Sequence, residues 1–409
     1  MAATDGNRFI QNILNSCFPA SDQSSLPLKD IKAAQAIRQC RTPALGYRAY
    51  RCPNAHEDKQ LYHSCRHRSC PLCAEKARHD WVERQKQRLL NCGHYHVIFT
   101  LPHEYLPLWQ YNRAWFTQTF FRVCRDTLMT LLKDRRYLGA TPGILMALHT
   151  WGRQLNCHPH IHCLVTAGGI AASGHWQPAR GEFLLPVRVV KTLFRGKLQA
   201  TIKTALQDGT LVCPDHTSLR QLLQSHHALY QKPWSVRIEE QYAHGRGVML
   251  YLARYLKGSP LHPQQIITCD SKRVVFRYLD HRDRRVKTLS LQMPEFIRRI
   301  LWHVPVPGLH VVRHYGLYAS QCRDQRNACR AVLGGAWEEA MASGPSDKAP
   351  FIWYCRTCGE ALRYLYTVKP GRTIENSFSK VPRDGFVQQD AHGGHRIRAP
   401  DTSMGQSFH

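Results

Sequence analysis

The chain has 409 residues, of which 43% are apolar and 10% aromatic, so it can fold into two or three globular domains and is not intrinsically disordered. Lysine and arginine total 56 against 29 acidic residues, giving a net charge of +27. A field of that sign favours a nucleic-acid partner. No apolar run approaches the roughly 20 residues that span a bilayer, and residues 1–10 lack the features of a signal peptide. We therefore expect a cytoplasmic protein with no membrane partner.

The N-terminal part of the chain changes character twice. Residues 1–39 predict a short helical lead. Residues 40–93 are rich in Cys, His and Arg and poor in aliphatic side chains, so we expect this segment to need a metal in order to fold. A strand is then predicted over 94–100 and a helical region over 115–131.

The rest of the chain mixes strands and helices without regular alternation. Further strands are predicted over 144–151, 160–166, 181–190 and 234–240, with a β-meander over 264–269, 272–279 and 285–291. Helices are predicted over 191–230, 248–256 and 294–302, and residues beyond 318 are expected to be irregular and to end in a disordered tail. This order indicates an α+β fold with a central, largely antiparallel sheet flanked by helices and preceded by a small zinc-binding domain. The expected domains are 1–39, 40–93, 94–320 and 321–409.

Closely spaced cysteines predict a zinc site within residues 40–93. The chain has 16 cysteines, and tight C-x-x-C spacing in a reducing compartment indicates metal ligation rather than disulfides. Thiolate and imidazole ligands suit tetrahedral Zn²⁺. More residues compete than one ion needs, namely Cys52, His56, Cys65, Cys70 and Cys73, with Cys40 upstream. Arg66 and Arg68 add positive charge to this segment, which favours docking to DNA.

A second candidate metal site lies on the strand predicted over 160–166. His158, His160 and His162 fall at alternate positions, so their imidazoles share one face of a strand. Two imidazoles leave a metal with open coordination positions, as catalytic sites do. Candidates for a third ligand are His149, Gln154 and His158, and the residues alone leave both this choice and the metal open.

The predicted helix over 248–256 carries a pair of possible nucleophiles. Tyr251 and Tyr255 lie four residues apart and therefore share one helix face, with Arg254 and Lys257 as nearby cations. A phenol can attack phosphorus and retain the phosphoryl group as an ester. The alternative is two aromatic core residues, but a metal strand in a strongly basic protein favours the catalytic interpretation.

Together, in this order, the motifs resemble the HUH endonucleases, and more closely the two-tyrosine transposases of rolling-circle insertion sequences, the IS91 group. The resemblance covers roughly residues 40–320 and rests on the segments SCRHRSCPLC, HVIFTLPHE, HTWGRQLNCHPHIHCLV, YLARYLKGSP and FIRRILWHVPVPGLHVVRHYGLYAS.

The resemblance implies a mechanism and a partner. His160 and His162 would bind Mg²⁺ or Mn²⁺ on an HUH-type sheet. Tyr251 and Tyr255 would each attack single-stranded DNA, at element ends and target, to form a 5′-phosphotyrosine and free a 3′-OH. The resemblance also implies that the protein is bacterial and associates with the nucleoid in the cytoplasm.

Two cysteine features are interpreted through the same resemblance. The family has C-x-x-C where this chain has Cys52 followed by His56, so a C-x3-H pair is the expected substitute. Cys355-x-x-Cys358 resembles a further zinc half-site, for which Cys322 and Cys329 are the expected partners.

Three other functions share part of this evidence. A rolling-circle replication initiator or relaxase would use the same nicking chemistry. A zinc-containing DNA-binding protein without catalysis would bind DNA but form no covalent adduct, and a metallohydrolase acting through the histidines would not need the tyrosines.

Overall fold

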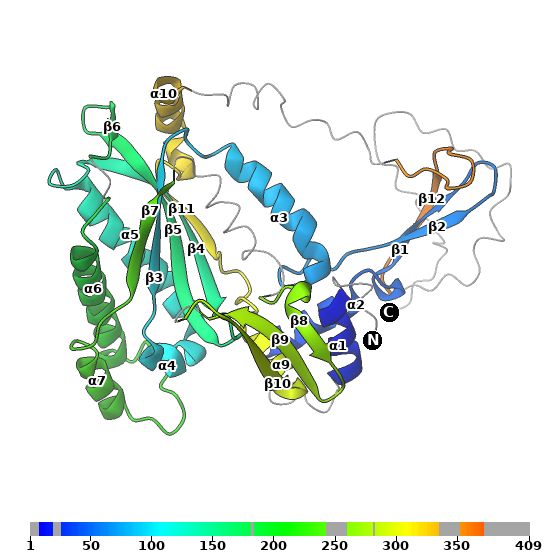
Figure 1. Ribbon diagram of the computed structural model, residues 1–409, viewed down its shortest axis with the longest axis horizontal. Helices are drawn as coiled ribbons and strands as arrows, with labels where there is room; N and C mark the ends of the chain where they lie inside the picture. Colours follow the sequence, from blue (N-terminus) through cyan, green and yellow to red (C-terminus); the bar gives the residue numbers. More distant parts are fainter. Residues whose placement is uncertain are drawn as a thin grey trace, which may run out of the picture.

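The computed structural model describes residues 8–18, 26–180, 184–242, 260–280, 283–334 and 352–371. Its largest sheet is antiparallel and lies in the left half of Figure 1. The strand order is β11-β4-β5-β3-β7, with β6 paired to β5. In that order the strands are β11 (Val312–Gly316), β4 (Ala140–Trp151), β5 (Cys157–Ala171), β3 (His94–Thr100), β7 (Val236–Tyr242) and β6 (Trp176–Pro178). The predicted α+β fold with a large antiparallel sheet flanked by helices is confirmed.

Helices cover one face of this sheet, on the left in Figure 1. They are α4 (Leu106–Tyr111), α5 (Arg113–Lys133), α6 (Val187–Gln207) and α7 (Leu219–Ala228). The large core lies between the sheet and α5 and α6, where alternate residues of the strands, such as Val97 and Ile161, are fully buried.

The predicted strand over 181–190 is wrong for its last part, because α6 begins at Val187. The β-branched residues there suggest a strand, but Val190, Phe194 and Leu198 recur at helical spacing and are all fully buried. Core packing at that period therefore overrides local β-propensity.

The opposite face of the sheet is only partly apolar. There α3 (Pro71–Lys86) and α10 (Arg323–Leu333) contribute to a smaller cluster that includes Trp81, Leu145, Leu164 and Tyr318. The helix α10 corrects the prediction of irregular structure beyond residue 318. Its Cys329 is buried in this cluster.

The N-terminal helices pack against the meander rather than against the large sheet. Helices α1 (Phe9–Cys17), α2 (Leu28–Gln39) and α9 (Met293–Trp302) surround one apolar cluster. The second sheet of this unit, order β10-β9-β8, confirms the predicted meander. Its strands are β8 (Ile266–Cys269), β9 (Arg273–Leu279) and β10 (Val286–Gln292).

A third sheet brings distant parts of the chain together, on the right in Figure 1. Strand β12 (Arg363–Val368) pairs antiparallel with β1 (Tyr47–Arg51), which also pairs with β2 (Asp58–Tyr62). Gly46, at φ +75°, permits this pairing, because a Cβ there would lie 2.1 Å from the carbonyl oxygen of Val368.

The four predicted domains stay a prediction, although β12 comes from beyond residue 320 and joins a sheet within residues 40–93. The short 3-10 turns are η3 (Pro43–Leu45), η4 (His103–Tyr105), η5 (Pro263–Gln265) and η6 (Ser320–Cys322). Within the described part of the chain, none of the helices combines the length and apolar character needed to cross a membrane.

Candidate functional site

The β4–β5 hairpin presents histidines on the face that α5 and α6 leave uncovered. Ile161 and Cys163 point into the large core, so His160 and His162, at the alternate positions, point to the opposite face. His149 on β4 lies directly opposite His160 in the strand register. Antiparallel pairing therefore adds a third imidazole to the two on β5.

The three imidazoles converge closely enough to share one metal ion. One ring nitrogen from each of His149, His160 and His162 lies within 4.8 Å of the others. The ring centroid of His162 lies 4.3 Å from that of His149 and 4.7 Å from that of His160. Two nitrogens bound to one metal at about 2.1 Å each lie at most about 4.2 Å apart, so the arrangement is close to a ligated one.

Of the three residues considered as third ligand, the structure brings His149 into this group. The Gln154 side chain lies in the hairpin loop and donates a 2.8 Å hydrogen bond to the Tyr278 hydroxyl. The ring of His158 lies 5.1 Å from that of His160 and 5.4 Å from that of His103, measured between centroids, but His158 does not belong to the group of three whose ring nitrogens converge. The assignment of the ligands themselves stays a prediction.

Hydrogen bonds fix the orientation of the two histidines on β5. The Nδ1 of His160 donates to the backbone oxygen of His158 at 2.7 Å, which leaves Nε2 as its ligand atom. The Nδ1 of His162 lies 2.7 Å from Nε2 of His96, on the neighbouring strand β3. Such partners set the tautomer and the direction of a ligating ring. Sequence reasoning missed His96, although His94 and His96 show the same alternate spacing on a predicted strand.

Burial keeps this group of imidazoles neutral. Desolvation lowers the pKa of His160 to about 4, and it lowers the pKa of His96 to about 4. Burial also places the pKa of His149 and of His162 well below the usual range. Neutral rings have the lone pair that metal binding requires. The donor set therefore fits a divalent ion at neutral pH.

The four functional residues predicted on the helix over 248–256 lie outside the described residues. They are Tyr251, Arg254, Tyr255 and Lys257. The described chain ends before them at Tyr242, which pairs with His94 on β3. It resumes before Leu261, which shares an apolar cluster with Leu155 in the β4–β5 loop.

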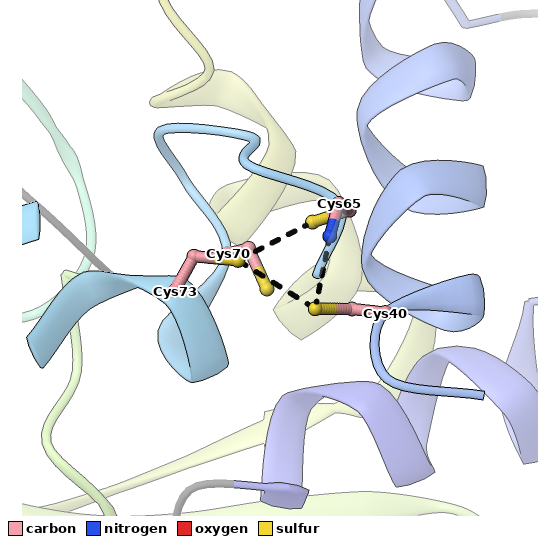
Figure 2. Close-up of side chains that lie close together, drawn as sticks. All are labelled: Cys40, Cys65, Cys70 and Cys73. Atoms are coloured by element: carbon pink, nitrogen blue, oxygen red, sulfur yellow. Dashed lines mark hydrogen bonds between the residues drawn. The ribbon is translucent and has the colours of Figure 1, made fainter. Parts of the chain in front are cut away.

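A compact cluster of four cysteines lies where α2 meets α3. Cys40 follows α2, Cys65 follows β2, and Cys70 and Cys73 flank the start of α3 (Figure 2). The Cys73 sulfur lies 3.6 Å from that of Cys40 and 3.7 Å from that of Cys65. Sulfurs on one tetrahedral zinc, each bonded at about 2.3 Å, would be about 3.8 Å apart.

The protein surroundings of this cluster also suit thiolates. Backbone N–H groups of Cys65 and His67 donate to the sulfurs of Cys40 and Cys65, each at 3.4 Å. Within the cluster, the side-chain hydrogen bond with Cys65 is the main cause that lowers the pKa of Cys40 to about 7, and the hydrogen bonds with Cys40 raise the pKa of Cys65 and of Cys70. The donor set fits Zn²⁺, and Pro71 at the first turn of α3 holds the last two cysteines at the start of a helix.

The six candidate zinc ligands divide between two places in the structure. Cys52 and His56 lie apart from the four-cysteine cluster and group with Cys355 and Cys358. The expected pairing of the C-terminal cysteines with Cys322 and Cys329 is therefore wrong. Spacing along the chain misleads here because the β1–β2 hairpin separates Cys52 and His56 from the cysteines that flank it.

The two arginines predicted to bind DNA differ in their surroundings. Arg66 is exposed and has a left-handed backbone conformation, with φ 54°. Arg68 is half-buried, donates to the backbone oxygen of Leu309 at 3.3 Å, and lines a cavity with Arg113 and Trp302. Burial lowers the pKa of Arg68. Of the two, Arg66 is the more accessible to solvent.

Comparison with known proteins identifies two family matches. Residues 10–101 match the family described as "Transposase zinc-binding domain", and residues 143–326 match the family described as "Putative transposase". The first match contains the four-cysteine cluster, and the second contains the three histidines. Zinc binding at the N-terminal cysteines is thus supported by both the family and the geometry.

Two curated relatives cover most of the chain. The "Putative transposase y4qJ" of Sinorhizobium fredii is 33% identical over 87% of this chain and 90% of its own length. The "Transposase for insertion sequence element IS801" of Pseudomonas savastanoi pv. phaseolicola is 30% identical over 85% of this chain and 86% of its own. No solved structure matches the chain. A transposase is a DNA-cleaving enzyme, and this chain belongs to the IS91 family of transposases.

Proposed function

We propose that this transposase nicks and rejoins single-stranded DNA at insertion-sequence ends, drives rolling-circle transposition, and depends on Mg²⁺ or Mn²⁺ held by His160 and His162. The observation that carries the proposal is the convergence of these two neutral imidazoles with that of His149 on one face of the sheet. The net charge of +27 supports a polyanionic substrate. Membership of a transposase family favours this function over a replication initiator or a non-catalytic DNA-binding protein.

The histidines would hold the metal and leave room for substrate. A bound divalent ion would polarise the scissile phosphate and stabilise the charge that develops on its oxygens. Hydrogen bonds that His162 makes with His96 on β3 and that His160 donates to the backbone fix the two rings, so the site is positioned before substrate binds. Phosphate oxygens in the coordination shell would favour Mg²⁺ or Mn²⁺ over the softer metals that imidazole alone prefers.

The covalent step requires a nucleophile, which we assign to Tyr251 and Tyr255. The phenol oxygen attacks phosphorus, a P–O bond to tyrosine forms, and the bond from phosphorus to the 3′-oxygen breaks. The departing 3′-oxygen takes up a proton, and the 5′ end stays attached as a phosphotyrosine. Because one phosphodiester replaces another, reversal by a different 3′-OH rejoins strands without ATP. Two tyrosines would permit two successive transfers.

The described residues on either side of the tyrosine segment are compatible with this assignment. Tyr242 lies in register with His94, and His94 in turn with Thr166 of β5. Leu261 shares its cluster with Leu155, at the other end of β5 beyond His160. The two flanks therefore lie toward opposite ends of the strand that carries the histidines.

The test is adduct formation on labelled single-stranded DNA taken from the element ends. We expect a denaturant-resistant protein–DNA band in Mg²⁺ or Mn²⁺ that disappears with chelator and in His160→Ala. Tyr251→Phe and Tyr255→Phe should each lose the adduct at their own position, and the double variant should form none. Tyr230→Phe, which changes an exposed tyrosine away from the site, is the matched control.

Two outcomes would contradict the proposal. An adduct that persists in the double Phe variant would refute the assignment of the nucleophiles. Metal-dependent cleavage without any adduct would instead indicate a metallohydrolase acting through the histidines.

A further inference from the structure

We propose that Cys52, His56, Cys355 and Cys358 bind a second Zn²⁺, which ties the C-terminal segment 352–371 to the N-terminal hairpin. One ligand atom from each of these residues lies within 4.8 Å of the others. The group shares no residue with the four-cysteine cluster. Its C-terminal half lies beyond both segments matched by the transposase families, which end at residues 101 and 326.

The distances fit a metal and not a disulfide. The sulfurs of Cys52 and Cys358 are 3.5 Å apart, and Nδ1 of His56 is 3.8 Å from the Cys52 sulfur. A disulfide would bring the two sulfurs to about 2.05 Å. Tetrahedral ligands on one zinc are separated by about 3.4 to 3.8 Å. Three thiolates and one imidazole form a common structural zinc set.

Each half of the group contains a turn that is closed by a backbone hydrogen bond of the same span. The Cys52 N–H donates to the oxygen of Glu57 at 2.9 Å, and the Cys355 N–H donates to the oxygen of Glu360 at 2.7 Å. Both bonds join a cysteine to the fifth residue after it. Each turn contains a residue with positive φ, Ala55 at 57° in the first and Gly359 at 74° in the second. Each half therefore has a turn that brings its own two ligands close together.

Hydrogen bonds to sulfur complete each turn. The Thr357 N–H donates to the Cys355 sulfur at 3.4 Å, and the Asn54 side-chain amide donates to the Cys358 sulfur at 3.6 Å. The second of these bonds crosses between the halves. Donors directed at sulfur favour the thiolate form that metal binding requires.

The surrounding packing is too small to hold these segments together by itself. Among the described residues, the apolar cluster at the site has Cys52, Cys355 and Leu362 as its buried members, with Tyr50 and Trp353 partly buried against it. A core of that size cannot offset the entropy of ordering two chain segments about 300 residues apart in sequence. A structural metal is the usual remedy in such small modules.

The second site gives the β1–β2 hairpin a zinc at each end. Cys40 and Cys65 flank its base, where the Arg41 N–H donates to the backbone oxygen of His63 at 3.0 Å. Cys52 and His56 lie in its turn. The base is held to α2 and α3, and the tip is held to the segment that supplies β12.

The test is the zinc content of the full-length protein, measured by elemental analysis after gel filtration. Every protein in this test also carries His160→Ala and His162→Ala, so that the histidine site takes up no zinc. In that background we expect two zinc ions per chain in the otherwise wild-type protein and one in Cys355→Ser/Cys358→Ser. The matched control is Cys213→Ser/Cys322→Ser, because neither cysteine belongs to a metal-binding group formed by the described residues; it should keep two. A single zinc in the wild type, or two in the first variant, would overturn the proposal.

A second variant keeps the test decisive if the serine variant misfolds. After substitution with Co²⁺, thiolate-to-metal absorption should correspond to seven thiolates in the wild type, four from one cluster and three from the other. His56→Cys should retain two metals and raise this absorption to that of eight thiolates. An unchanged spectrum in His56→Cys would show that residue 56 is not a ligand and would overturn the assignment. Neither readout depends on DNA cleavage, so the result is independent of the proposed function.

Discussion

Replacing His96 by phenylalanine should weaken Mn²⁺ binding at the histidine site while leaving the three imidazoles in place. The His96 ring is buried on β3, and its Nε2 lies 2.7 Å from Nδ1 of His162. Phenylalanine has a similar ring but offers no nitrogen. The change therefore removes one hydrogen bond to the proposed ligand and little of the packing.

The expected loss follows from the tautomer that metal binding selects. When Nε2 of His162 binds metal, Nδ1 carries the proton and must donate it. Without His96 that buried donor loses this acceptor, at a cost of about 1–3 kcal/mol. The metal-free protein can avoid part of this cost by changing tautomer, so most of it falls on the metal-bound form. We expect the Kd for Mn²⁺ to rise about 10- to 100-fold, as is typical when a partner of a ligating histidine is removed.

The assay is titration of Mn²⁺ into the zinc-loaded, full-length protein, with free Mn²⁺ measured by electron paramagnetic resonance. The matched control is His94→Phe, on the same strand and the same face. His94 bonds to the Tyr318 hydroxyl at 2.6 Å and to the backbone oxygen of Cys92 at 2.9 Å, away from the site. We expect His94→Phe to lower stability but to change the Kd by no more than about twofold.

Two results would refute the reasoning. Wild-type Mn²⁺ affinity in His96→Phe would mean that the β3 histidine does not orient a ligand. Equal weakening in both variants would mean that the effect comes from loosening of β3 rather than from the lost hydrogen bond.

Two further predictions concern stability. Phe194→Ala in α6 removes a fully buried ring from the large core and should lower the free energy of unfolding, measured in guanidinium, by about 3–5 kcal/mol. The control Val189→Ala, at an exposed position of the same helix, should change this free energy by less than about 0.5 kcal/mol. Similar losses in the two variants would contradict the placement of the core. His314 bonds to Gln85 at 2.7 Å, and burial lowers its pKa to about 4. In the unfolded state the histidine pKa is about 6.5, so the unfolded chain binds the proton first as the pH falls, and stability should decline between about pH 6.5 and pH 4. This decline should be shallower in His314→Gln. It should be unchanged in a variant of the exposed His175.

The histidine strand could be predicted from sequence because its signal is local. Alternate spacing places His160 and His162 on one face of any strand, whatever its neighbours. The third imidazole depends on register, since His149 reaches the site only through its pairing with His160 across β4 and β5. His96 depends in the same way on β3 lying beside β5. Residue spacing within one strand carries no information about either alignment.

The cysteine assignments show a different limit. The six candidate ligands within residues 40–73 correctly predict a zinc-binding region. Two of them, Cys52 and His56, instead group with Cys355 and Cys358, about 300 residues later in the chain. The antiparallel pairing of β12 with β1 creates that grouping. Short strands of mixed polarity, such as Arg363–Val368, give weak sequence patterns, and for this reason the C-terminal region was expected to be irregular.

Helix α3 runs from the four-cysteine cluster to the sheet face that carries the histidines. Its first turn contains Cys73, and its Trp81 packs with Leu145 and Leu164 on the large sheet. These two leucines lie on the same face as the histidines, because Leu145 precedes His149 by four residues on β4 and Leu164 follows His162 by two on β5. Zinc at the four-cysteine cluster would therefore fix the end of a helix whose middle covers the apolar half of the histidine face. The helix would thereby hold the four-cysteine cluster at a defined separation from the histidine site.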